Sequence, residues 1–352
     1  MSSLATKPLI DAETTLMFSE AAEGGAAVER FLTTNAAALA RLSAHLQANP
    51  PRSVTTVARG SSDHAATFGK YLIETLTGVP TSTAAMSVSS IYAAPVVAAD
   101  SLCIAISQSG RSPDLLATVE AHRKAGAYIV ALVNDETSPL AAMADVLLPL
   151  YAGPEKSVAA TKSYIASLAG LAAIAAGWAG DEALLDALKT LPAQLKAAFA
   201  LDWTSAVKTL SDANNLFVIG RGYGFAVAQE AALKLKETCA LHAEAFSSAE
   251  VKHGPMAIVN DGFPVLAFAT SDAAGDGVRE VAQEFAGRGA SVMLANVEAV
   301  AGTIALPALA SHAALEPILM IQSFYRLANG LSVARGLDPD SPPHLNKVTK
   351  TV

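Results

Sequence analysis

The feature that most constrains the fold is a repeat within the chain. Apolar, strand-like runs recur in the same order, each 162 or 163 residues further on. The pairs are 53–58 with 215–220, 102–107 with 265–270, and 127–134 with 290–297. The first pair also shares its continuation, because Arg59-Gly60 and Arg221-Gly222 follow the two runs. Equivalent segments at equal spacing predict two similar domains in tandem.

Within each half, short apolar runs alternate with helical patterns of about 12–15 residues. Such alternation indicates parallel strands joined by helical crossovers. We therefore predict an α/β fold of two doubly wound parallel sheets, each in a flavodoxin-like three-layer αβα domain. The expected segments are an N-terminal helical segment (1–44), a first domain (45–195), a second domain (196–335) and a Pro-rich extended arm (336–352).

Charge and hydropathy exclude several classes of protein. The formal charge is −8 and no basic run is present, which argues against a nucleic-acid partner. Residues 163–180 are apolar but consist mostly of Ala, Gly and Ser, so we expect a buried core helix rather than a membrane span. The first 15 residues do not resemble a signal peptide, and we expect a cytoplasmic protein.

The two cysteines indicate no metal chemistry. Cys103 and Cys239 lie in apolar or helical contexts without ligand spacing, as buried thiols in a reducing compartment do. We expect neither a metal nor a cofactor.

Polar turns follow several of the predicted strands. In "SQSGRSPD", Gly110 allows close backbone approach, and Ser112 and Pro113 suit a helix N-terminus. Free N–H groups and hydroxyls at such a place suit an anion, although an ordinary capped turn would have a similar composition. Hydroxyl-rich turns at 61–62 and 157–161 are expected at the same sheet edge, which favours a phosphate site.

Six motifs together resemble the sugar isomerase (SIS) family, most closely the isomerase half of glucosamine-6-phosphate synthase. They are "ARGSS" (58–62), "ISQSGRSPD" (106–114), "SVAATK" (157–162), "EAALKLKE" (230–237), "HAEAFSSAEVKHGP" (242–255) and "HLNK" (344–347). The resemblance implies two SIS domains and a sugar-phosphate ligand. It assigns the 6-phosphate to Ser62, Ser107, Gln108, Ser109 and Ser112, and the sugar to Ser61, Val158 and Ala160.

The resemblance also implies three catalytic residues. Glu237 matches the base that moves a proton between C1 and C2, a role that partial burial of a carboxylate supports. His253 matches a ring-opening histidine supplied by the neighbouring subunit, which implies a homodimer or larger oligomer. Lys347 matches the lysine that forms a Schiff base, or it acts as a charge or proton carrier. From the residues alone, the favoured interpretations are a surface ion pair of Glu237 with Lys234 and an ordinary loop histidine at 253.

The expected activity is that of a stand-alone deaminase, which converts glucosamine 6-phosphate and water to fructose 6-phosphate and ammonia. No cysteine lies near the start of the chain, so we expect no glutaminase activity. Arg59, Arg111 and Ala160 depart from the synthase pattern beside the ligand. Galactosamine 6-phosphate, a fructosamine 6-phosphate, isomerisation without deamination and a non-catalytic sugar-phosphate sensor therefore stay open.

Overall fold

The computed structural model describes residues 10–347. Its first sheet is parallel throughout and has the strand order β2-β1-β3-β4-β5. These strands are β1 (Ser53–Val57), β2 (Thr81–Thr83), β3 (Ser101–Ser107), β4 (Tyr128–Val133) and β5 (Val146–Pro149). β3 is buried along its whole length, as expected for the central strand of a sheet covered on both faces.

The second sheet repeats the first. Its order is β10-β9-β8-β6-β7, and it is again parallel. Strands β6 to β10 therefore take the same sheet positions as β1 to β5, respectively. The strands are β6 (Asn215–Gly220), β7 (His242–Ser247), β8 (Pro264–Phe268), β9 (Ser291–Asn296) and β10 (Ile304–Pro307). The predicted tandem of doubly wound sheets is confirmed.

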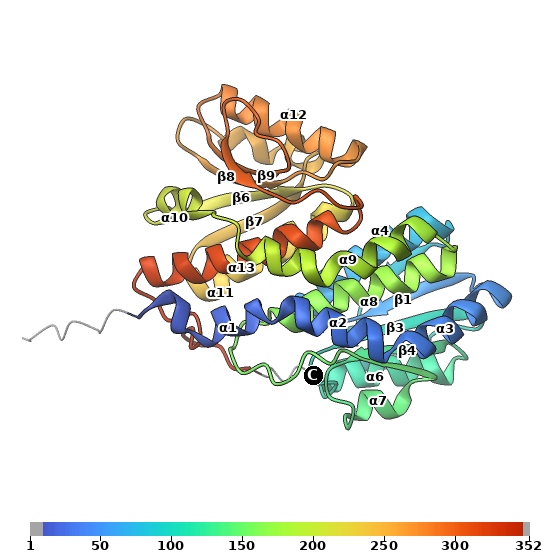
Figure 1. Ribbon diagram of the computed structural model, residues 1–352. Helices are drawn as coiled ribbons and strands as arrows, with labels where there is room; N and C mark the ends of the chain where they lie inside the picture. Colours follow the sequence, from blue (N-terminus) through green and yellow to red (C-terminus); the bar gives the residue numbers. More distant parts are fainter. Residues whose placement is uncertain (1–9, 348–352) are drawn as a thin grey trace, which may run out of the picture.

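Helices cover both sheets and fill the space between them. Figure 1 shows α4, α8, α9, α11 and α13 between the sheets, with α12 outside the second sheet and α6 and α7 outside the first. The helices of the two halves are α4 (Ser61–Thr77), α5 (Ser87–Ser90), α6 (Pro113–Lys124), α7 (Pro139–Met143), α8 (Lys162–Ala179), α9 (Glu182–Phe199), α10 (Thr204–Leu210), α11 (Tyr223–Cys239), α12 (Ala273–Gly287) and α13 (Glu316–Ala334), with short 3₁₀ turns η2 (Glu250–His253) and η3 (Pro255–Ile258).

The N-terminal segment is several short helices. It contains η1 (Ala12–Thr14), α1 (Leu16–Ala22), α2 (Gly24–Thr34) and α3 (Ala36–Ala48). α2 and α3 pack against α8, and α2 also packs against α9, so this segment belongs to the first half's helical layer. The expected segment begins in residues 1–9, which lie outside the described residues.

The apolar stretch expected at 163–180 is the core helix α8. All but two of its residues are buried, because the N-terminal helices and α4 surround it. Within residues 10–347, no helix is both long and apolar enough to cross a bilayer.

The two halves differ at the equivalent ends of β3 and β8. In the first half, the turn after β3 faces a cavity lined by Ser107, Gln108 and Ser109. In the second half, the carboxylate of Glu316, which is only 1% exposed, accepts the N–H of Ser271 at 2.6 Å. The turn after β8 is thus held by an internal carboxylate, whereas the turn after β3 faces a cavity.

We expect Glu316→Ala to lower the free energy of unfolding by about 1–3 kcal/mol, because the Ser271 N–H loses a hydrogen bond to a charged acceptor. Glu280→Ala removes an exposed carboxylate on α12 and is the matched control, with an expected change within about 0.5 kcal/mol. Thermal and urea unfolding of both variants measure this difference. Equal stability of the two variants would show that Glu316 does not hold the turn.

Candidate active site

A cavity of about 350 Å³ lies at the carboxyl ends of β1 and β3. In doubly wound sheets this edge is the usual ligand site. The turns after the two strands, the loop before α8 and the C-terminal tail all contribute to it. Its lining is Arg59, Gly60, Ser61, Ser62, Ile106, Ser107, Gln108, Ser109, Ser112, Leu115, Ala160 and Lys347.

The turn from Ser107 to Ser112 presents hydrogen-bond donors to the cavity. Gly110 has φ +63° and donates its N–H to Ser107 Oγ at 2.9 Å, which folds the turn tightly. A Cβ at Gly110 would overlap the Ser138 side chain, so the position requires glycine. Ser112 is the N-cap of α6 but makes no side-chain capping bond, and Pro113 opens the helix, as predicted. Hydroxyls and the positive end of α6 therefore face one small volume.

Arg59 supplies a positive charge beside this turn. Its Nε and Nη2 donate to one carboxylate oxygen of Asp114, at 2.9 and 2.7 Å. The Asp114 side chain is fully buried, whereas that of Arg59 is 54% exposed and lines the cavity. Without the guanidinium, the Asp114 carboxylate would repel an anion at the N-terminus of α6. Arg59, which the sequence analysis noted only as a departure from the family pattern, therefore lies beside the hydroxyls of the cavity.

Arg111 does not join this site. Its Nη2 donates to Asp135 at 2.8 Å, and the residue is not part of the cavity lining. The Thr137 hydrogen bonds, with the Arg111 guanidinium, hold the pKa of Asp135 below its usual value. The expectation that residue 111 bears on the ligand is wrong for its side chain, because an exposed carboxylate pairs with it outside the cavity.

The tail places Lys347 in the cavity wall. Figure 1 shows the chain returning after α13 to the first half. Lys347 Nζ donates to the Ser157 carbonyl at 2.7 Å and to Glu155 at 3.3 Å. The buried Glu155 carboxylate also accepts the N–H groups of Thr161 and Ser163 at 3.0 and 3.1 Å. Glu155, which the sequence analysis did not single out, therefore joins the arm, the loop and the start of α8.

A buried ion cluster lies behind Ser61. Lys234, 1% exposed, donates from Nζ to Glu237 at 2.5 Å and to Ser61 Oγ at 3.1 Å. Its Nζ is also 3.3 Å from Glu230, which is fully buried. Burial would lower the pKa of Lys234, but the two carboxylates raise it above its usual value. Burial would likewise raise the pKa of Glu230, but Lys234 and a hydrogen bond from His64 lower it. Both groups are therefore charged at neutral pH.

The predicted residues are not all brought together. Those assigned to the phosphate, with Ser61 and Ala160, line the cavity, but Val158 does not. Glu237 is one contact away from the lining, through Lys234 and Ser61, and its side chain is 22% exposed. His253 is exposed at the end of η2, in the second half, and is not part of the lining. Lys234 and Glu237 form the expected ion pair, but it is not the surface pair of the plain interpretation, because Lys234 is buried.

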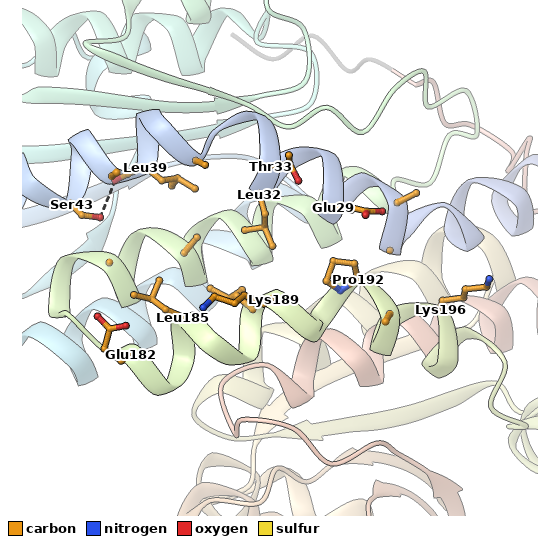
Figure 2. A pocket seen from close by; sticks show the side chains of 18 of the residues that line it. Glu29, Leu32, Thr33, Leu39, Ser43, Glu182, Leu185, Lys189, Pro192 and Lys196 are labelled. Atoms are coloured by element: carbon orange, nitrogen blue, oxygen red, sulfur yellow. Dashed lines mark hydrogen bonds between the residues drawn. The ribbon is translucent and has the colours of Figure 1, made fainter.

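A larger cavity, about 1140 Å³, lies between the helix pair α2–α3 and α9. Figure 2 shows Leu32, Leu39 and Leu185 on its walls, with Lys189 and Pro192 on the α9 side. Its walls are mostly Ala, Gly and Leu, and no strand-end turn reaches it. It lacks the cluster of donors that a phosphate needs. Among residues 10–347, no group of three or more His, Cys, Asp or Glu side chains is arranged to hold a metal ion.

Sequence comparison relates both halves to one family. The SIS domain profile matches residues 49–176 and 209–303. The glutamine–fructose-6-phosphate aminotransferase (isomerizing) of Symbiobacterium thermophilum is 37% identical over 317 residues, which cover 84% of this chain and 51% of that protein. The chain thus spans about half the length of the curated relatives it matches.

Solved structures agree with this relationship. A candidate phosphosugar isomerase of Silicibacter pomeroyi DSS-3 superposes with a TM-score of 0.89 at 44% identity, covering 93% of this chain and all of that one. The C-terminal domain of glucosamine-fructose-6-phosphate aminotransferase from Francisella tularensis has a TM-score of 0.83 at 27% identity, covering 94% of this chain and all of that one.

We expect Arg59→Ala to weaken binding of fructose 6-phosphate by about 10- to 100-fold, the effect of losing a charge-assisted hydrogen bond and its counter-charge. Titration calorimetry measures this change. Arg111→Ala is the matched control on the same turn, and its affinity should stay within about twofold of the wild type. If the two arginine variants lose affinity equally, Arg59 is not a specific anion contact.

Proposed function

The chain belongs to the SIS domain family, and on that premise we propose that it converts glucosamine 6-phosphate and water to fructose 6-phosphate and ammonia. One observation carries the proposal: Lys234 joins Ser61 in the cavity wall to the carboxylate of Glu237. A candidate base, with a cation beside it, thus lies next to a cavity rich in phosphate donors.

The phosphate is the anchor of the proposed substrate. Ser62, Ser107, Gln108, Ser109 and Ser112 offer neutral donors around the N-terminus of α6, and Arg59 adds charge. A phosphate monoester carries close to two negative charges at neutral pH and accepts several hydrogen bonds. The lining thus favours a sugar phosphate over an unphosphorylated sugar. In the proposed complex the sugar extends toward Ser61, Ala160 and Lys347.

Glu237 is the proposed base for the isomerisation. In the open-chain aldehyde it removes the proton from C2, and the resulting enolamine takes a proton at C1. C1 then carries a CH₂OH group and C2 carries an iminium. Water adds to C2 and ammonia leaves, so atoms and charge balance. The ammonium of Lys234, 2.5 Å from Glu237, stabilises the carboxylate form that accepts the proton.

Ring opening requires proton transfer between O1 and O5, and His253 is the residue we propose for it. Because His253 is exposed on η2 and is not part of the cavity lining, it would act on the cavity of a second subunit. The proposal therefore includes a homodimer. An imidazole can both donate and accept a proton, which suits transfer in both directions.

We propose that Lys347, in the C-terminal arm, acts at C2 of the substrate. Its contacts with Glu155 and the Ser157 carbonyl hold the amine at the cavity wall. In the deaminating direction it would serve as a positive charge or proton carrier beside the leaving ammonia. A Schiff base with the ketose would require the amine to lose its proton first.

We propose that the reaction exchanges nitrogen as free ammonia and not through glutamine. Neither Cys103 nor Cys239 is suited to attack a glutamine amide. Burial raises the pKa of Cys103 to about 12 and that of Cys239 to about 11. A thiol that stays protonated at neutral pH is a poor nucleophile.

A second candidate function is the cleavage of a fructosamine 6-phosphate formed with an amino acid. The position of Arg59 in the cavity wall favours it, because a guanidinium is a suitable partner for a second anionic group such as a carboxylate. Such a substrate would release an amino acid rather than ammonia.

The test is product stoichiometry. We expect the wild type to release ammonia and fructose 6-phosphate in equal amounts from glucosamine 6-phosphate. Glu237→Gln should lower kcat by about a hundredfold or more, because the variant cannot take the C2 proton. Coupled assays for ammonia and fructose 6-phosphate, run in parallel, measure both products.

Glu244→Gln is the matched control, since Glu244 is an exposed carboxylate on β7. It should keep wild-type activity. Tight binding of the sugar phosphate without ammonia release would rule out deamination of this substrate. Release of an amino acid from a fructosamine 6-phosphate would then support the second candidate.

A further inference from the structure

A histidine–carboxylate pair, with a fully buried carboxylate, lies on the far side of Lys234 from Glu237. His64, in the first turn of α4, places Nδ1 2.9 Å from one carboxylate oxygen of Glu230. The other oxygen of Glu230 is 3.3 Å from Lys234 Nζ and also accepts the hydroxyl of Tyr325 at 3.3 Å. A continuous series of contacts therefore runs from Glu237 through Lys234 and Glu230 to His64, which belongs to the first half.

This chain of contacts holds more carboxylates than ammonium groups. Glu230 and Glu237 are two carboxylates, and Lys234 is the single ammonium between them. A fully buried carboxylate requires hydrogen-bond donors on both oxygens, because water cannot supply them. If Glu230 lost the donor on one oxygen, it would compete more strongly with Glu237 for the ammonium of Lys234.

We propose that His64 is a positioning residue for the proton transfer: it holds Glu230 in place, so that Lys234 bridges Ser61 and Glu237 at the cavity. This inference rests on the proposed function of Glu237. His64 belongs to the first half, and the proposed base Glu237 belongs to the second half. The first half would therefore help to position the base.

The other ionisable groups around the pair do not replace His64. Burial raises the pKa of Tyr164 on α8 and of Tyr325 on α13 well above the usual value, so both are neutral. Burial also raises the pKa of Asp63, beside His64 on α4, although His64 and Arg59 oppose that shift. The cation that faces Glu230 from its own helix is Lys234, which is already shared.

The direction of the effect does not depend on whether His64 is charged. A neutral imidazole stabilises the Glu230 carboxylate by donating a hydrogen bond, and an imidazolium adds a positive charge. In either form, its removal draws Lys234 toward Glu230 and weakens its contact with Glu237. The carboxylate of Glu237 then takes up a proton more readily, so the acid limb of the pH–rate profile should move to higher pH.

The test compares His64→Leu with His64→Asn, whose amide can still donate to Glu230. For the leucine variant we expect kcat to fall about tenfold, as loss of a hydrogen bond to a charged group allows, with KM within about twofold. The acid limb of kcat should move upward by about half a pH unit or more. The asparagine variant should retain most of the wild-type kcat. His45→Asn, on α3 and stacked on Tyr128, is the control, with an unchanged profile.

Two kinetic results would overturn the inference: a wild-type kcat and pH profile for His64→Leu, or an asparagine variant as impaired as the leucine variant. If the leucine variant does not fold, His64→Ala, which also lacks the donor, takes its place, with the same expected fall in kcat and the same shift of the acid limb.

A second readout does not need activity. Histidine-labelled protein shows the His64 imidazole resonances by NMR, and Glu230→Gln should change the ring chemical shifts by replacing the carboxylate that contacts Nδ1. Unchanged chemical shifts would contradict the pairing. If the wild type proves to be inactive on amino-sugar phosphates, the proposed function fails, while this measurement still decides whether His64 and Glu230 form the pair.

Discussion

The buried ammonium of Lys234 is the interaction on which the proposed site depends. It comes from α11 of the second half and contacts Ser61 of the first half, 173 residues away in sequence. A buried ammonium without a counter-charge would destabilise the fold, so the carboxylates of Glu230 and Glu237 are needed to neutralise it. This contact fixes the two domains relative to each other at the cavity. The turn from Ser107 to Ser112 lies on one side, and the candidate base Glu237 lies on the other. Tyr164 strengthens the same junction by donating its hydroxyl to the Ala226 carbonyl at 3.3 Å.

The two halves of the repeat share a backbone but differ around the cavity. Gly60 and Gly222 begin α4 and α11 with nearly the same backbone, φ +54° and +56°, so both halves turn from strand to helix in the same way. The two halves differ in the turns at the carboxyl ends of β3 and β8. In the first half, hydroxyls and a helix N-terminus surround a cavity, whereas in the second half the Glu316 carboxylate accepts the Ser271 N–H after β8. The second half contributes Lys234 and Glu237 from α11 instead. In the proposed reaction the first half thus binds the phosphate, and the second half supplies the base.

The sequence was sufficient to predict the parts of the fold and site that depend on local patterns. The tandem of parallel sheets follows from the two matching series of apolar runs, and the turn at 107–112 could be identified because Ser, Gly and Pro follow a buried strand. Contacts between distant residues could not be predicted in this way. His64 meets Glu230 across 166 residues, and neither residue belongs to a pattern that indicates the other. The prediction for Arg111 is wrong for a related reason, because only the folded chain shows that Asp135 draws it out of the site. The role of His253 stays a prediction, since it depends on a second subunit.

The most direct test of the central claim is proton exchange at C1. We propose that the first half anchors a sugar phosphate while a carboxylate of the second half moves a proton between C1 and C2. Incubation of fructose 6-phosphate with the protein and ammonium in D₂O, followed by NMR, should show deuterium entering at C1. No deuterium at C1 under conditions in which calorimetry shows the sugar phosphate to be bound would contradict this proposal, and would leave a protein that binds sugar phosphates without acting on them.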